Sequence, residues 1–176
     1  MELELAWSIG FVALMVTAMV SDVSTRRIPN GLVLAGLTFA LALRATAGLA
    51  IVDGLTGAAL ALAIVFPLFT LRALGGGDVK LIVALGAFTG PSGLFSALLA
   101  SAVAGGVLGI AVALRRGVLL PAMMSAKDLV THAAWFGRRG ERVTLESPAA
   151  LTVPYGAAIA TGSLYAWFVL LEQVPW

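Results

Sequence analysis

Two aspartates lie at the ends of long apolar runs, and they are the residues best suited to chemistry. Asp22 follows the first apolar run, and Asp78 follows three glycines just before the fourth. A carboxylate next to hydrocarbon is costly and by default marks a functional site. Two close carboxyl groups can share one proton. The ionised group can then deprotonate a water, while the protonated group polarises a carbonyl and later protonates the leaving amine.

Each aspartate also has a purely structural interpretation. Asp22 could be a solvated residue at a helix end, and Asp78 could cap the helix that follows it. For either acid alone the structural interpretation is favoured. For both acids on one face of a membrane, catalysis is favoured, and this chemistry needs no metal and no cofactor.

The composition defines the class of protein. The chain has 176 residues, of which 60% are hydrophobic and 11% charged, against about 25% charged in soluble domains. With a mean hydropathy of +1.02, it is expected to be an integral membrane protein of one domain, residues 1–176, whose main partner is the lipid bilayer. It has no cysteine and one histidine, which excludes disulfides, thiol catalysis and metal clusters built on these residues. The net charge of +2 gives no nucleic-acid signal.

The apolar runs predict an all-α, polytopic fold. Six transmembrane helices are expected at about 5–20, 31–50, 55–71, 79–88, 94–114 and 149–171, with a loop over 115–148 that includes an interfacial segment. Asp53-Gly54 and Thr89–Gly93 are predicted turns. Arg44 is close enough to the end of its run to snorkel to the membrane surface.

The distribution of basic residues orients these spans. Ten of the 11 Lys and Arg residues follow the first, third and fifth spans, and Arg44 is the exception. Because basic loops stay in the cytoplasm, both termini are predicted outside. Asp22 and Asp78 are then both on the cytoplasmic side.

The fourth span is predicted to be short. Ten residues cover roughly 15 Å, about half of a hydrocarbon core. The glycine loop before it should therefore dip into the membrane, and its glycines, Gly75, Gly76 and Gly77, permit unusual backbone angles and close approach. Lys80 could bias the ionisation of Asp78, or it could be an anchor at the membrane surface.

These residues together resemble a known family. Asp22 with Arg26-Arg27-Ile28-Pro29-Asn30, then Gly75-Gly76-Gly77-Asp78-Val79-Lys80-Leu81 and Pro154-Tyr155-Gly156, are similar to the motifs of the type IV prepilin peptidases. The resemblance implies that Asp22 and Asp78 are the catalytic pair. It also implies pilin-like precursor substrates, whose short basic leader is cut at the cytoplasmic face of the bacterial inner membrane. Pro29, Asn30, Pro154, Tyr155 and Gly156 are expected near substrate or behind the acids.

One departure from the family pattern narrows the expected activity. Larger members carry a cytoplasmic insert with two Cys-x-x-Cys pairs and also N-methylate the new terminus, whereas this chain has no cysteine. Methyl transfer is therefore not expected, and the chain resembles the minimal peptidases of Flp-type (tight-adherence) pilus systems. A small ion-coupled transporter and a non-catalytic pilus-assembly subunit are the alternatives, and the oligomeric state stays open.

Overall fold

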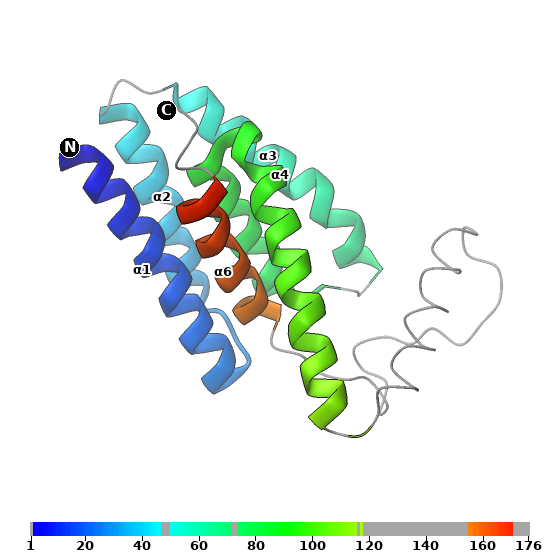
Figure 1. Cartoon of the computed structure of the whole chain (residues 1–176). Helices are drawn as coiled ribbons and strands as arrows, with labels where there is room; N and C mark the ends of the chain where they lie inside the picture. The colour runs from blue at the N-terminus through cyan, green and yellow to red at the C-terminus, as the bar shows by residue number, and fades with distance from the viewer. Residues whose placement is uncertain (1, 47–49, 72–73, 116, 118–154, 171–176) are drawn as a thin grey trace. The chain divides into compact units, whose positions relative to one another are not determined.

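The structure is a computed structural model that describes residues 2–46, 50–71, 74–115, 117 and 155–170. Its elements are α1 (Glu2–Thr25), α2 (Asn30–Thr46), α3 (Ile51–Thr70), α4 (Gly76–Arg115), α6 (Tyr155–Tyr165) and a short π-helix, η1 (Ala166–Leu170) (Figure 1). No strand occurs within these described ranges. The predicted all-helical class is confirmed. Pro154 lies outside the described residues. So does the predicted loop over 115–148, except for Arg115 and Gly117.

Three of the helices, α1, α3 and α4, are long and apolar enough to cross a membrane, and α2 is a shorter apolar helix. Large apolar side chains also cover their exposed surface, including Leu62 on α3 and Leu99 on α4. In water such a surface would be strongly unfavourable, whereas lipid solvates it. The chain is therefore a membrane protein.

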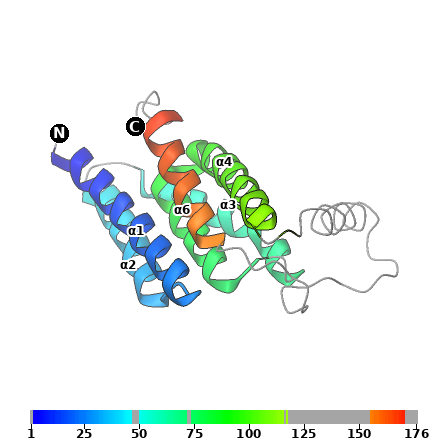
Figure 2. The same cartoon turned by 60° about the horizontal axis from the view of Figure 1, so that its bottom comes forward.

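Helix α4 is broken at Gly90. This residue has φ 66° and ψ −178°, which is outside the helical region, and Pro91 follows it. An unbroken helix of 40 residues would measure about 60 Å, twice the thickness of a hydrocarbon core. Instead the segment up to residue 89 runs in one direction and the segment from 91 to 105 runs back beside it (Figures 1 and 2). The turn predicted at 89–93 is confirmed.

The chain divides into two compact units, residues 1–105 with 154–176, and residues 106–153. The first contains α1, α2, α3, most of α4, α6 and η1, and the core and the candidate site lie within it. The second contributes only the last turns of α4 and Gly117 to the described residues. Within the first unit, consecutive helical segments alternate in direction (Figures 1 and 2).

Two predicted loops are helical instead. Helix α1 continues to Thr25, so Asp22 lies in its last turn and not in a loop. Arg26, which directly follows the helix, has a φ of 55°. Helix α3 begins at Ile51 and includes Asp53 and Gly54. An acid in the first helical turn interacts favourably with the helix dipole, which explains why the predicted Asp-Gly turn is wrong.

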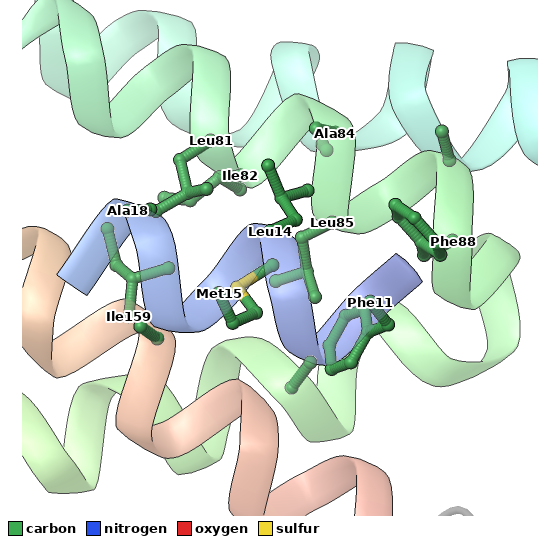
Figure 3. Close-up of a cluster of buried hydrophobic side chains, with 14 of the residues drawn as sticks. Phe11, Leu14, Met15, Ala18, Leu81, Ile82, Ala84, Leu85, Phe88 and Ile159 are labelled. Atoms are coloured by element: carbon green, nitrogen blue, oxygen red, sulfur yellow. The ribbon is translucent and has the colours of Figure 1, made fainter. Parts of the chain in front are cut away.

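The core of the first unit forms around α1. Phe11, Leu14, Met15 and Ala18 of α1 are buried, and they lie between the first half of α4 and α6 (Figure 3). Leu81, Leu85 and Phe88 of α4 face them, with Ile159 on the α6 side. Phe88 packs edge-on against Phe11 at a ring separation of 5.4 Å. This packing holds the ends of α1, α4 and α6 in register.

Glycines allow α3 and α6 to pack closely against α4. A side chain at Gly57 of α3 would strike the backbone of Gly86 and Gly90 in α4, and one at Gly162 of α6 would strike the backbone of Ser101. Small residues at helix contacts are typical of membrane proteins, where close backbone packing drives association.

Arg44 is buried, so the prediction that it snorkels is wrong. Only 6% of its surface is exposed. Its Nε and Nη2 atoms donate to the carbonyls of Ala87 and Phe88, each at 3.0 Å. Its guanidinium also lies 5.2 Å from the centre of the Trp7 ring. The side chain thus satisfies the carbonyls at the end of the first half of α4, which have no helical partner because the helix breaks at Gly90.

Candidate active site

Three helix ends meet at one end of the first unit: the last turn of α1 and the first turns of α4 and α6 (Figures 1 and 2). Each carries a part of the predicted site. The last turn of α1 carries Asp22, the first turn of α4 carries Asp78, and the first turn of α6 carries Tyr155 and Gly156. The alternating helix directions bring these sequence-distant residues to the same end.

Asp22 is buried, with 7% of its surface exposed, so its interpretation as a solvated helix-end residue is wrong. Its Oδ2 atom accepts a hydrogen bond of 3.2 Å from the backbone N–H of Ala157. Ala157 lies in the first turn of α6, where N–H groups lack helical partners and favour an anion. The N-terminus of α6 therefore supports the carboxylate of Asp22.

Asp78 is half-buried and is the third residue of α4, which begins at Gly76. It is therefore not the N-cap residue. Its carboxyl group reaches back to hydrogen-bond the backbone of Gly75, as acids at this helical position do in a capping box. The first helical turn and this bond fix where the carboxyl group lies.

The glycine stretch is only partly a loop. Gly76 and Gly77 are helical, Gly75 precedes the helix, and none of the three has a positive φ. The unusual backbone angles predicted for them are therefore absent. Close approach is present: a Cβ at Gly75 would lie 3.0 Å from Oδ2 of Asp78, and one at Gly77 would lie 3.3 Å from Cβ of Ile28. The helix thus starts earlier than predicted, and the first half of α4 measures roughly 20 Å.

The two carboxyl groups are close enough for their charges to interact. Because like charges at short range disfavour double ionisation, such a pair tends to hold one proton between its members. Among the described residues, no group of three or more His, Cys, Asp or Glu side chains could hold a metal ion. The arrangement can therefore offer one base and one acid side by side.

Ile28 joins the three helix ends, and sequence reasoning did not place it in the site. Its side chain is buried, and it touches Gly77 at the start of α4 and Gly156 at the start of α6. It lies in the short segment between α1 and α2, which is held by a 2.7 Å hydrogen bond from Oγ of Ser21 to the carbonyl of Arg27. An apolar residue within a polar segment is the sequence signal that could have identified it.

Lys80 and Asn30 are brought together. The Nζ atom of Lys80 donates to Oδ1 of Asn30 at 2.8 Å, and both side chains are exposed. This bond connects the first turn of α4 to the first turn of α2. Pro29 directly precedes α2, and its carbonyl accepts the N–H of Leu32 at 3.2 Å. Of the predicted Pro154-Tyr155-Gly156 motif, Tyr155 is partly exposed, whereas Gly156 is buried against Asp22.

The pattern of two acids at helix ends coincides with a family match. The model of the type IV leader peptidase family matches residues 9–110, which include Asp22, Ile28, Asn30, Asp78 and Lys80. The chain belongs to the type IV leader peptidase family. This confirms the resemblance predicted from the motifs and makes the chain a member of a family of peptidases. Comparisons with curated proteins and with solved structures found no match.

Proposed function

We propose that this leader peptidase family member is an aspartic endopeptidase that uses Asp22 and Asp78 to remove the short basic leader from pilin-like precursors of the Flp type. The observation that carries the proposal is the meeting of two acids from separate helices, with interacting charges, in a chain of this family. No cysteine exists in the chain, so a thiol cannot be the nucleophile.

The reaction follows general acid–base chemistry. The ionised carboxylate takes a proton from a water molecule, whose oxygen attacks the scissile carbonyl. The protonated carboxyl group donates a hydrogen bond to the carbonyl oxygen as negative charge develops there, and its proton passes to the leaving amine. Asp22 accepts the Ala157 N–H and Asp78 is held by the backbone of Gly75, so both groups are oriented before substrate binds.

The proposed location of the site is the cytoplasmic face of the bacterial inner membrane. Six crossings, formed by α1, α2, α3, the two halves of α4, and α6 with η1, would place both termini outside. The basic residues beside the acids, Arg26, Arg27 and Lys80, support this orientation because basic segments stay in the cytoplasm. A precursor whose leader is followed by a hydrophobic helix would present its cleavage site at this depth.

The proposed protein is a single peptidase domain, 1–176, without methyltransferase activity. The absence of cysteine supports this restriction, because the family members that methylate carry a cysteine-containing insert.

Co-expression with a Flp-type precursor tests the proposal. We expect leader removal, seen as a mobility shift of the precursor, and no loss of cleavage when membranes are treated with a metal chelator. Asp22→Asn and Asp78→Asn should each abolish the shift while the protein still accumulates in the membrane. Normal cleavage by either variant, or loss of cleavage with the chelator, would contradict this chemistry.

A further inference from the structure

The first turn of α6 packs directly against the carboxyl group of Asp22. A Cβ atom added at Gly156 would lie 2.9 Å from both Cγ and Oδ2 of Asp22. Real Cβ atoms essentially never come this close to another heavy atom. Because Gly156 has no side chain, the carboxyl group of Asp22 can occupy this space.

Ile28 also borders the space next to Gly156. The added Cβ would also lie 2.9 Å from Cδ1 of Ile28, whose side chain is buried. A side chain at position 156 would therefore strike two buried side chains at once, and a shift of Ile28 alone would not relieve the contact with Asp22. Either the carboxyl group would move, or α6 would withdraw and stretch the 3.2 Å hydrogen bond from Ala157 N–H to Asp22.

We propose that Gly156 is a positioning residue for the peptidase reaction: by lacking a side chain, it lets the first turn of α6 contact Asp22 and fix its carboxylate through the Ala157 N–H. The kinetic consequence rests on the proposed function, because it requires Asp22 to be catalytic. The contact between Gly156 and Asp22 does not depend on the proposed function. The family match ends at residue 110, so this role adds an element of the chain that lies beyond the matched region.

A thermal-unfolding cycle in detergent tests the contact without reference to activity. Gly156→Ala should lower the Tm of the wild-type protein by about 3 °C or more. In an Asp22→Ala background the same substitution should have a clearly smaller effect, because the two Asp22 atoms that it strikes are gone and only the contact with Ile28 remains. Equal shifts in the two backgrounds would overturn the proposal.

Cleavage kinetics on the purified protein test the role in turnover. Gly156→Ala should lower kcat by as much as on the order of 100-fold, as small misplacements of catalytic groups do, with a much smaller change in KM. Adding Ile28→Val, which removes Cδ1, should restore part of kcat because α6 gains room to move off the carboxyl group. Unchanged kcat in folded Gly156→Ala protein would overturn the role.

Two further variants separate the possible failures. Gly31→Ala is the matched control, since a Cβ at Gly31 has no atom within 4 Å, and it should cleave at the wild-type rate. Asp22→Asn reports on the proposed function alone. If it remains active while the unfolding cycle still shows coupling, the contact is real but the catalytic assignment of Asp22, and with it the positioning role, is wrong.

Discussion

Asp22 and Asp78 are positioned by different local contacts. Asp22 is fixed by a neighbouring helix, through the N–H of Ala157, whereas Asp78 is fixed within its own helix start, through Gly75. The types and order of these acids could be predicted from the sequence, because carboxylates beside hydrocarbon are rare. The supporting contacts could not, because a backbone N–H has no sequence signal, and an apolar Ile28 within a polar segment does not show which helix ends it will contact.

The Lys80–Asn30 bond gives a prediction at this scale. Lys80→Met should lower the cleavage rate roughly three- to ten-fold, since a typical hydrogen bond contributes about 0.5–1.5 kcal/mol and this one is exposed. The loss arises because the first turns of α2 and α4 are no longer tied. Asn30→Ala should cause a similar loss, and the double variant should add little to either.

Arg27→Met is the matched control, because it removes an exposed cation from the same end of the unit. If it slows cleavage as much as Lys80→Met does, the cleavage rate depends on local positive charge and not on the Lys80–Asn30 hydrogen bond. Cleavage rates measured at several salt concentrations would separate these two causes further.

At the scale of the helices, the break in α4 determines where Asp78 lies. The turn signal around Gly90-Pro91 was visible in the sequence. The residue that donates hydrogen bonds to the carbonyls at the broken helix end was not. Arg44 was expected to reach the membrane surface, but it donates to the carbonyls of Ala87 and Phe88. A single charge in an apolar run is compatible with either position, and only the packing of α2 against its neighbours decides between them.

Replacement of Arg44 tests its contribution to this break. Arg44→Met should destabilise the protein by about 2–4 kcal/mol, since two buried carbonyls lose their donor at roughly 1–3 kcal/mol each with partial relaxation. Thermal unfolding in detergent would measure the change. Arg115→Met, at the exposed end of α4, should leave the Tm nearly unchanged, and an equal loss there would contradict a specific role for Arg44.

The contact of α3 with α4 gives a second prediction at this scale. Gly57→Ala should cost roughly 1–3 kcal/mol, because its methyl group would overpack against the backbone of Gly86 and Gly90. Gly109→Ala has open space around its Cβ and should be neutral or slightly stabilising. The same unfolding assay applies, and a stable Gly57→Ala protein would show that the two helices do not pack this closely.

At the scale of the whole molecule, the distribution of charge predicts which face the site occupies. Arg44, the one basic residue that did not fit the inside-positive pattern, is buried and so does not bear on orientation. Within the described residues, the all-helical class and the order of the helices followed from the apolar runs. Their lengths did not, because α1 continues past the apolar run as far as Thr25 and α3 begins before its run.

Cysteine labelling can test this orientation cleanly, because the chain has no native cysteine. Ser24→Cys at the site end and Val52→Cys at the start of α3 both replace exposed residues. In intact cells with a permeable outer membrane, an impermeant maleimide should label Val52→Cys only. Ser24→Cys should become labelled after the inner membrane is disrupted, and labelling of Ser24→Cys in intact cells would reverse the proposed topology.

The central claim is that Asp22 and Asp78 act as one catalytic unit, and single-turnover cleavage of a purified precursor tests it most directly. Asp22→Asn, Asp78→Asn and the double variant should all lose activity to about the same extent, at least roughly 10³-fold, because groups that act together are not additive. Asp53→Asn, an exposed acid at the start of α3, should cleave normally. Additive losses, or substantial activity in either single Asp22 or Asp78 variant, would contradict the account.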